Sequence, residues 1–264
     1  MFTTTTINNV RLSFIDKGEG PAILFAHGFP FSRAIWQPQI TAFAKTHRVI
    51  APDLRGHGQS SAPAGIYAME TFADDLHHLI EERKCGPVVL VGHSMGGYIS
   101  FAFYRNFPQK VRALILFCTR ASADSEEGKA ARENLAQRAE REGPAAVAEQ
   151  MLPKMLAPAT AASRPELVAQ VRDFMLATSV NGLTGSLRGM AARPSAVELL
   201  PKIAVPTLVV AGENDLIIPA SEAATMAKTI PNAELAMISH AGHLASLENP
   251  DEVIVRMQQF LDKI

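Results

Sequence analysis

The chain has 264 residues, of which 47% are hydrophobic and 19% are charged, and its formal net charge is −1. This composition excludes a disordered chain and indicates one large packed domain, or one domain that carries a substantial insertion. The near-zero charge and the lack of a long basic run make nucleic acid and an anionic membrane poor candidates for a partner.

Cysteine usage and hydropathy indicate the compartment. The two cysteines, Cys85 and Cys118, form no CxxC pattern, so we expect no disulfide framework and a reducing environment. The opening residues MFTTTTINNVRLSF lack the basic and apolar regions of a secretory signal. No apolar run approaches the roughly 20 residues that span a bilayer. We therefore expect a cytoplasmic protein.

The chain begins with a pattern typical of a β-hairpin, because two β-prone runs, TTTTI and VRLSFID, flank the turn pair Asn8–Asn9. Short apolar runs then close on turns that contain Gly or Asp. These runs are AILFAHG (22–28), HRVIAPD (47–53), VVLVGHS (88–94), ALILFCT (113–119), TLVVAGEND (207–215) and AELAMISHAGH (233–243). Continuous apolar runs of this kind are typical of strands buried on both faces of a parallel sheet.

Helix-like segments at 69–84 and 96–108 alternate with these strands. The alternation predicts a doubly wound α/β fold with a mostly parallel sheet. The rhythm breaks over 121–200, which is rich in Ala, Glu and Arg and has helical periodicity without a convincing strand. We interpret 121–200 as a helical lid inserted into a core formed by 1–120 and 201–264.

The strongest motif is GHSMG at residues 92–96, which matches G-x-S-x-G between an apolar strand and a helix. That setting is the one a nucleophile elbow requires. Such a turn strains the backbone of Ser94, and side chains at positions 92 and 96 are expected to collide with neighbouring strands. The motif predicts Ser94 as a nucleophile at the start of a helix, where N–H groups favour negative charge. The alternative is a plain β–α turn with a solvent-facing serine.

A serine hydroxyl that attacks a carbonyl creates an oxyanion, which needs at least two hydrogen-bond donors. The backbone N–H of Met95, directly after Ser94, supplies one. The N–H of Phe29, in the turn within ILFAHGFP (23–30), is the candidate for the other. We expect His27 in that turn to order the loop by hydrogen bonding rather than to transfer protons.

An acid and a base follow later in the chain. Asp215 lies just past an apolar strand, on the same sheet edge as Ser94, and the next strand ends in HAGH with His243 as its last residue. The order Ser, Asp, His is the one expected for this architecture. His243 is then the general base toward Ser94, and Asp215 fixes the imidazole tautomer and stabilises the imidazolium.

Three other carboxylates compete for the role of the acid. Glu213 lies two residues before Asp215 but has a longer side chain, and Asp124 follows the strand ALILFCT. Asp53 ends VIAPD and is more simply interpreted as ordering the turn DLRGHG.

His240 and His243, three residues apart, also raise a metal hypothesis. The spacing is not HExxH, neither cysteine offers a nearby third ligand, and GENDLIIP lacks an EF-hand register. We therefore expect no metal and interpret His240 as structural. Glu248 is expected to help begin a C-terminal helix over 250–264, whose first turn holds Pro250, Asp251 and Glu252.

Together these residues resemble the α/β-hydrolase superfamily, from about residue 8 to the C-terminus. The motifs that carry the resemblance are HGFP (27–30), PDLRGHGQS (52–60), GHSMGG (92–97), GENDLIIP (212–219) and AGHLASLENP (241–250). The resemblance implies a serine hydrolase without a cofactor, with Ser94, Asp215 and His243 as the triad and Phe29 and Met95 as oxyanion donors.

Within the superfamily, a serine at position 94 argues against haloalkane dehalogenases and epoxide hydrolases, which carry an aspartate there. The segment CTRASADSEEGKAARENL (118–135) and a short helical lid are similar to the carboxylesterase and 3-oxoadipate enol-lactonase branch. That branch implies small-molecule esters or lactones as substrates and an acyl-enzyme on Ser94. A dicarboxylic substrate needs a cation, and Arg120, Arg188 and Arg193 are available, although an exposed helical arginine is more often a solvated surface group.

We expect a mostly apolar pocket between lid and sheet edge, suited to short acyl chains or a lactone ring. The candidate lining residues are Phe29, Phe31, Trp36, Met95, Met151, Met155 and Leu216. An ordinary core position is the alternative for each of them.

Other functions stay open on the same residues. C–C bond hydrolysis and perhydrolysis use similar constellations. A ligand-binding module with vestigial turnover is a further alternative, because fold does not dictate function. Nothing in the sequence indicates an oligomeric state.

Overall fold

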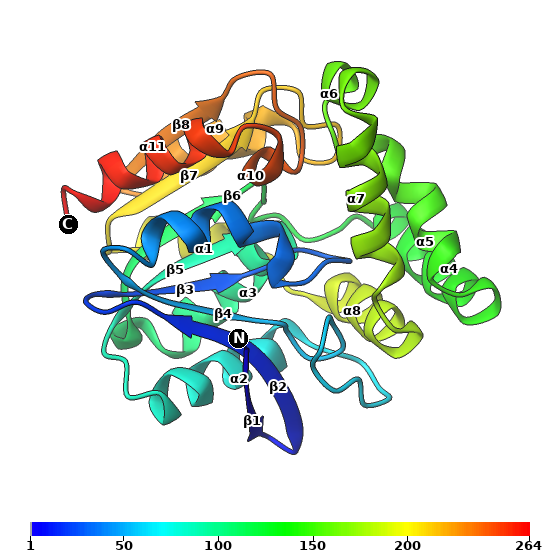
Figure 1. The fold of residues 1–264 in the computed structure, drawn as a ribbon, viewed down its shortest axis with the longest axis horizontal. Coiled ribbons are helices and arrows are strands. Elements are labelled where there is room, and N and C mark those ends of the chain that lie inside the picture. Colours follow the sequence, from blue (N-terminus) through cyan, green and yellow to red (C-terminus); the bar gives the residue numbers. More distant parts are fainter. Residues whose placement is uncertain (1) are drawn as a thin grey trace.

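The computed structural model describes residues 2–264 and places an eight-stranded sheet between two layers of helices (Figure 1). The strands lie in the order β1-β2-β4-β3-β5-β6-β7-β8. Their bounds are β1 (Thr3–Ile7), β2 (Val10–Lys17), β3 (Ala22–Ala26), β4 (Arg48–Pro52), β5 (Val88–His93), β6 (Val111–Phe117), β7 (Thr207–Gly212) and β8 (Ala233–Ile238).

The N-terminal hairpin is the antiparallel part of the sheet. β1 pairs with β2, and β2 pairs with β4, both antiparallel, whereas the neighbours from β4 to β8 are parallel. Asn8 and Asn9 form the hairpin turn with φ of 49° and 61°, in the left-handed region that asparagine tolerates. The predicted doubly wound, mostly parallel sheet with an antiparallel N-terminal hairpin is confirmed.

Helices connect the strands and cover both faces of the sheet. The bounds are α1 (Gln37–Phe43), α2 (Met69–Glu82), α3 (Met95–Asn106), α4 (Glu126–Glu142), α5 (Pro144–Met151), α6 (Pro158–Ser163), α7 (Pro165–Leu176), α8 (Val180–Ala192), α9 (Ala220–Thr229), α10 (Ala245–Glu248) and α11 (Pro250–Leu261), with 3₁₀ helices η1 (Arg33–Trp36), η2 (Pro108–Lys110), η3 (Leu152–Lys154) and η4 (Val197–Lys202). The predicted segments 69–84, 96–108 and 250–264 correspond to α2, α3 and α11. Sequence patterns did not predict α1 and α9, which are short.

Each central strand contributes side chains to two hydrophobic cores, one on each face of the sheet. Leu24 and Leu90 belong to the core on the side of α2, α3 and α9, whereas Phe25 and Val91 belong to the core on the side of α1 and α11. Because both faces are covered, every residue of β3 and β5 is buried. This double burial explains the continuous apolar runs in the sequence.

Helices α4 to α8, here called the cap (126–192), lie between β6 and β7 in the chain and gather beyond the carboxyl ends of the strands (Figure 1). α8 contacts the core backbone directly. A Cβ at Gly189 would lie 1.7 Å from the carbonyl oxygen of Tyr67, and one at Gly182 would lie 1.8 Å from that of Gly56. Tyr67 N–H also donates to the carbonyl oxygen of Gly185 at 3.0 Å. This side of the cap is therefore tightly seated.

The described chain has no helix that combines the length and the apolar character needed to cross a bilayer.

Candidate active site

Ser94 lies at a sharp turn between β5 and α3. Its φ of 52° and ψ of −109° are strained for any residue with a side chain. The turn is held by two hydrogen bonds: Ser94 N–H donates to Phe117 O at 2.9 Å, and the Thr119 hydroxyl donates to Ser94 O at 2.8 Å. The neighbouring strand β6 and the loop after it therefore stabilise the strained conformation.

Glycines on either side of Ser94 allow α3 to approach the sheet. A Cβ at Gly96 would lie 2.2 Å from the carbonyl oxygen of Ala26, at the end of β3. A Cβ at Gly92 would lie 2.3 Å from Gly96 O and from Ser100 Oγ. The predicted collision with a neighbouring strand thus occurs at position 96, whereas at position 92 the obstacle is the first two turns of α3.

Asp215 and His243 meet at the carboxyl ends of β7 and β8. His243 Nδ1 lies 2.8 Å from Asp215 Oδ2, and both side chains are buried. Asp215 Oδ1 accepts the N–H groups of Ile217 and Ile218 at 2.8 and 3.0 Å. Burial opposes ionisation of Asp215, but His243 and the two N–H groups outweigh it and lower the pKa of the carboxyl. The arrangement holds a carboxylate against the imidazole.

The competing carboxylates lie elsewhere. Glu213 accepts the N–H of His240 at 3.2 Å, and Asp53 pairs with Arg33 at 2.5 Å. Asp53 also accepts the N–H of Gln59 at 2.8 Å, which orders the turn as expected. Asp124 is bound by arginines of the cap and its flanks.

Two side chains that the sequence did not single out for this role hold the loop of His243. His93 Nε2 donates to the carbonyl oxygen of His243 at 2.7 Å. The Glu248 carboxylate accepts the N–H of Gly242 at 2.8 Å and, from the cap, the N–H of Ala157 at 2.8 Å. Burial raises the pKa of Glu248. Two features of the sequence could have pointed to these side chains. His93 directly precedes Ser94 in the G-x-S-x-G motif, and Glu248 follows His243 by five residues.

Glu248 does not begin the C-terminal helix, contrary to prediction. Asn249 is the N-cap of α11, and its side chain accepts the N–H of Glu252 at 3.4 Å. Pro250 is the first residue of the helix, as expected. His240 is exposed, with a φ of 56°.

The loop after β3 brings the second proposed donor to the site. Phe29 lines the same cavity as Ser94, and Met95 begins α3, where a backbone N–H has no acceptor within the helix. His27 is buried and orders this loop: Nδ1–H donates to Gly28 O at 2.9 Å, and Nε2 accepts the N–H of Leu54 at 3.0 Å. Burial lowers the pKa of His27 to about 4, so the ring is neutral near pH 7.

Ser94, His243 and Phe29 open onto one cavity of about 80 Å³. Its lining residues are Phe29, Ser94, Tyr98, Arg120, Arg132, Met151, Met190, Ile217, Ile218 and His243. A groove of about 320 Å³ shares Arg120, Arg132, Met151 and Ile217 with it and extends over the cap. The site therefore has an inner chamber and an outer approach.

Five of the seven predicted pocket residues do not line the cavity, unlike Phe29 and Met151. Met95 is fully buried in the core on the side of α2, α3 and α9. Trp36, Phe31 and Met155 are fully buried in the core on the side of α1 and α11 and do not line the cavity, which corrects their assignment. Trp36 packs against Phe25, with ring centroids 5.2 Å apart. Leu216 is 54% exposed and lines only the outer groove.

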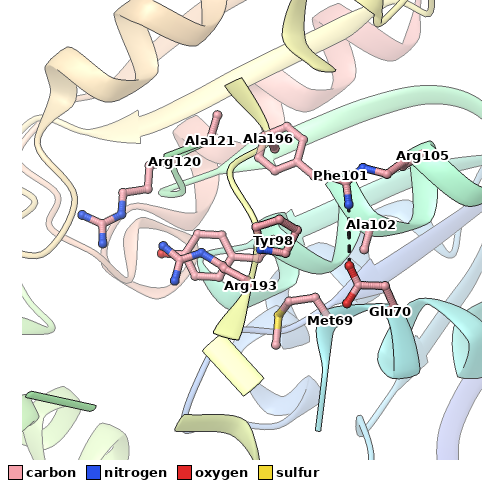
Figure 2. A pocket seen from close by; sticks show the side chains of 11 residues that line it. Met69, Glu70, Tyr98, Phe101, Ala102, Arg105, Arg120, Ala121, Arg193 and Ala196 are labelled. Atoms are coloured by element: carbon pink, nitrogen blue, oxygen red, sulfur yellow. Dashed lines mark ion pairs between the residues drawn. The ribbon is translucent and has the colours of Figure 1, made fainter. Parts of the chain in front are cut away.

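Some of the lining residues that were not predicted could have been identified from their positions in the sequence. Tyr98 follows Ser94 by one helical turn, and Ile217 and Ile218 directly follow Asp215. Tyr98 also lines a small hollow of about 10 Å³ beside the cavity, together with Arg120 and Arg193 (Figure 2). Arg132 and Met190 come from the cap, where no motif marks them.

Three buried side chains, His93, Cys118 and His243, bring potential ligand atoms within 4.8 Å of one another. One ring nitrogen of each histidine is engaged in a hydrogen bond. Nδ1 of His243 is engaged by Asp215, and Nε2 of His93 by the His243 carbonyl oxygen. Burial raises the pKa of the Cys118 thiol well above its usual value, whereas a ligating cysteine is a thiolate. The neutral thiol fits a packed support behind the imidazole of His243.

The family model for the alpha/beta hydrolase fold matches residues 21–250, and the chain belongs to this family. It is a hydrolase. Among solved structures, a thermophilic esterase from Thermogutta terrifontis with malate bound is 40% identical, with a TM-score of 0.95 over 99% of this chain and 97% of the other. The enol-lactonase from Burkholderia xenovorans LB400 is 27% identical, with a TM-score of 0.92 over 98% and 100%. The 3-oxoadipate enol-lactonase 2 of Acinetobacter baylyi is 26% identical over 94% of this chain and 91% of its own length.

Proposed function

We propose that the chain is a cofactor-independent serine hydrolase that cleaves small carboxylic esters or lactones through an acyl-enzyme on Ser94. The observation that carries the proposal is that Ser94, on a strained elbow, lines one cavity with His243, whose ring is hydrogen-bonded to Asp215. The likeness to an esterase and to enol-lactonases supports the ester and lactone class.

In the proposed reaction, His243 removes the hydroxyl proton of Ser94 as the oxygen attacks the substrate carbonyl. The N–H groups of Met95 and Phe29 stabilise the oxyanion of the tetrahedral intermediate. The imidazolium of His243 then protonates the leaving alcohol and afterwards activates the water that hydrolyses the acyl-enzyme. Asp215 keeps the imidazole in the tautomer with Nδ1–H, so that Nε2 is free to accept the proton.

The test is turnover of p-nitrophenyl acetate and butyrate by the wild type, Ser94→Ala and Ser221→Ala. Ser221 is exposed on α9 and serves as the matched control. We expect Ser94→Ala to abolish turnover and the pre-steady-state burst of p-nitrophenol, and Ser221→Ala to retain both. Equal hydrolysis by the wild type and Ser94→Ala would refute the assignment of the nucleophile.

A substrate panel separates the proposed chemistry from the alternatives on the same residues. Faster cleavage of ring-cleavage diketones than of esters or lactones would assign the site to C–C hydrolysis, and peracid formation from carboxylic acids and peroxide would assign it to perhydrolysis. Tight binding of esters with almost no turnover would favour a ligand-binding role.

A further inference from the structure

Three arginines meet one carboxylate at the edge of the cavity. Asp124 is buried and pairs with Arg132 at 2.5 Å, with Arg193 at 2.8 Å, and with Arg120. Within residues 2–264, Asp124 is the one carboxylate that forms an ion pair with any of these arginines. The cluster therefore carries two positive charges that it does not balance itself.

The three guanidinium groups differ in how their N–H donors are used. Arg193 donates to Met190 O at 2.7 Å and to Ser122 O at 3.0 Å, and it stacks on the ring of Tyr98 at 3.9 Å. Arg132 directs its Nε and one Nη to Asp124.

Arg120 is the arginine that has an unused hydrogen-bond donor in the described chain. Its Nη2 donates to Asp124, but its Nε is buried and has no hydrogen-bond partner in the described chain. A buried donor without an acceptor is costly, and such groups call for an explanation. In Figure 2 the guanidinium of Arg120 extends away from the stacked pair of Tyr98 and Arg193. A bound anion would supply the missing acceptor.

Two arginines of this cluster lie next to the proposed catalytic residues. Arg120 and Arg132 line the inner cavity together with Ser94 and His243. The same two arginines line the outer groove, to which Lys154 adds another cation. A substrate that moves from the groove to Ser94 therefore passes, and then remains beside, a cluster with more positive than negative charge.

We propose that the substrate is an acidic ester or lactone, whose distal carboxylate binds Arg120 while its scissile carbonyl lies at Ser94. This inference rests on the proposed function and names the substrate class of that site. An arginine recognises a carboxylate through N–H···O bonds, and on Arg120 the Nε–H has no acceptor in the described chain, whereas Nη2 is shared with Asp124. Arg120 is then a specificity-determining residue, and Arg132 adds electrostatic attraction.

The test compares two esters of equal chain length that differ in charge. Mono-p-nitrophenyl glutarate carries a free carboxylate, and methyl p-nitrophenyl glutarate is its neutral counterpart. We expect the wild type to have the higher kcat/KM for the acid, mainly through a lower KM. In Arg120→Gln, whose amide can still donate to Asp124, the ratio of the two kcat/KM values should fall roughly tenfold to a hundredfold.

Arg188→Gln is the matched control. Arg188 lies in the cap, pairs with Glu133 and Glu140 at 2.9 and 2.8 Å, and lines neither the cavity nor the groove. The ratio should not change in this variant. Arg120→Lys keeps the charge without the planar fork, and it should retain part of the preference for the acid.

A second pair of esters determines which side of the ester bond carries the anion. 3-Acetoxybenzoate and methyl 3-acetoxybenzoate place the charge, or its neutral counterpart, in the leaving group. A charge preference that depends on Arg120 for the glutarates assigns the carboxylate to the acyl side, and one for the acetoxybenzoates assigns it to the alcohol side.

Binding without turnover gives an independent measurement. Glutarate should bind to Ser94→Ala in calorimetry and should bind more weakly, by at least about tenfold, when Arg120→Gln is added. The inference is overturned if the wild type prefers the neutral ester in both pairs, or if Arg120→Gln leaves every ratio unchanged. Failure of the proposed function is distinct, because then no ester is turned over or Ser94→Ala is as active as the wild type.

Discussion

Three buried neutral histidines should make the folded protein sensitive to mild acid. His27, His57 and His93 are inaccessible to solvent, and burial lowers their pKa values to about 4, about 3 and about 3, from an ordinary value of 6.5. Below pH 6.5 the unfolded chain therefore binds protons at these positions that the folded chain does not bind. Their contribution to stability is complete above pH 6.5 and is lost as the pH falls toward 4.

The magnitude follows from one proton per histidine. Each group costs about 1.4 kcal/mol of unfolding free energy for each pH unit below 6.5. For the three together, the loss between pH 7.5 and 5.5 is about 4 kcal/mol, a large part of the stability of an ordinary domain. Carboxyls with lowered pKa, such as Asp16 and Asp215, add to the loss only at more acidic pH.

The measurement is urea unfolding at a series of pH values from 7.5 to 5.5, read as unfolding free energy against pH. His57→Asn is the informative variant, because the Asn amide can still donate to the carbonyl oxygen of Arg55, the partner of His57 Nδ1 at 2.9 Å. It should reduce the acid-induced loss by about a third. His78→Asn, at an exposed position, is the control. A slope near zero between pH 6.5 and 5.5 would show that the buried rings protonate in the fold, and would refute the reasoning.

Further predictions concern single side chains. Asp215→Asn should lower kcat by about 10⁴-fold because the tautomer of His243 is no longer fixed, and a loss below tenfold in steady-state kinetics would contradict this role. Gly96→Ala places a methyl group 2.2 Å from Ala26 O and should cost about 1 to 3 kcal/mol, seen as a lower Tm; an unchanged Tm would contradict the close approach. Asp124→Asn leaves three guanidinium groups without their counterion, so the denaturant midpoint should fall by an amount equivalent to about 3 kcal/mol. An unchanged midpoint would show that solvent already screens the cluster.

The fold was predictable because local patterns agree with it. Continuous apolar runs reflect strands covered on both faces, and the parallel sheet brings the ends of those strands to one edge. For that reason Ser94, Asp215 and His243, which are far apart in sequence, could be assigned to one edge from strand ends alone. The short helices α1 and α9 were missed because their periodic patterns are too short to stand out.

The lining of the cavity was less predictable, because the sequence does not distinguish an apolar side chain that faces the cavity from one that faces the core. Trp36, Phe31 and Met155 are as hydrophobic as Met151, yet they fill the core between sheet and helices. Arg132 faces the cavity because of how α4 packs on α8, a contact between segments that no local pattern encodes.

Glu248 links the loop of the proposed base to the cap. Its carboxylate holds the loop of His243 through Gly242 N–H and the cap through Ala157 N–H. Leu244 N–H also donates to the carbonyl oxygen of Met155 at 3.1 Å, so the loop and the cap share a second bond. A cap grafted from a relative to change substrate range would displace the proposed base unless the backbone at 155–157 kept its place. Successful exchanges of the cap should therefore keep this junction and replace the helices on either side of it.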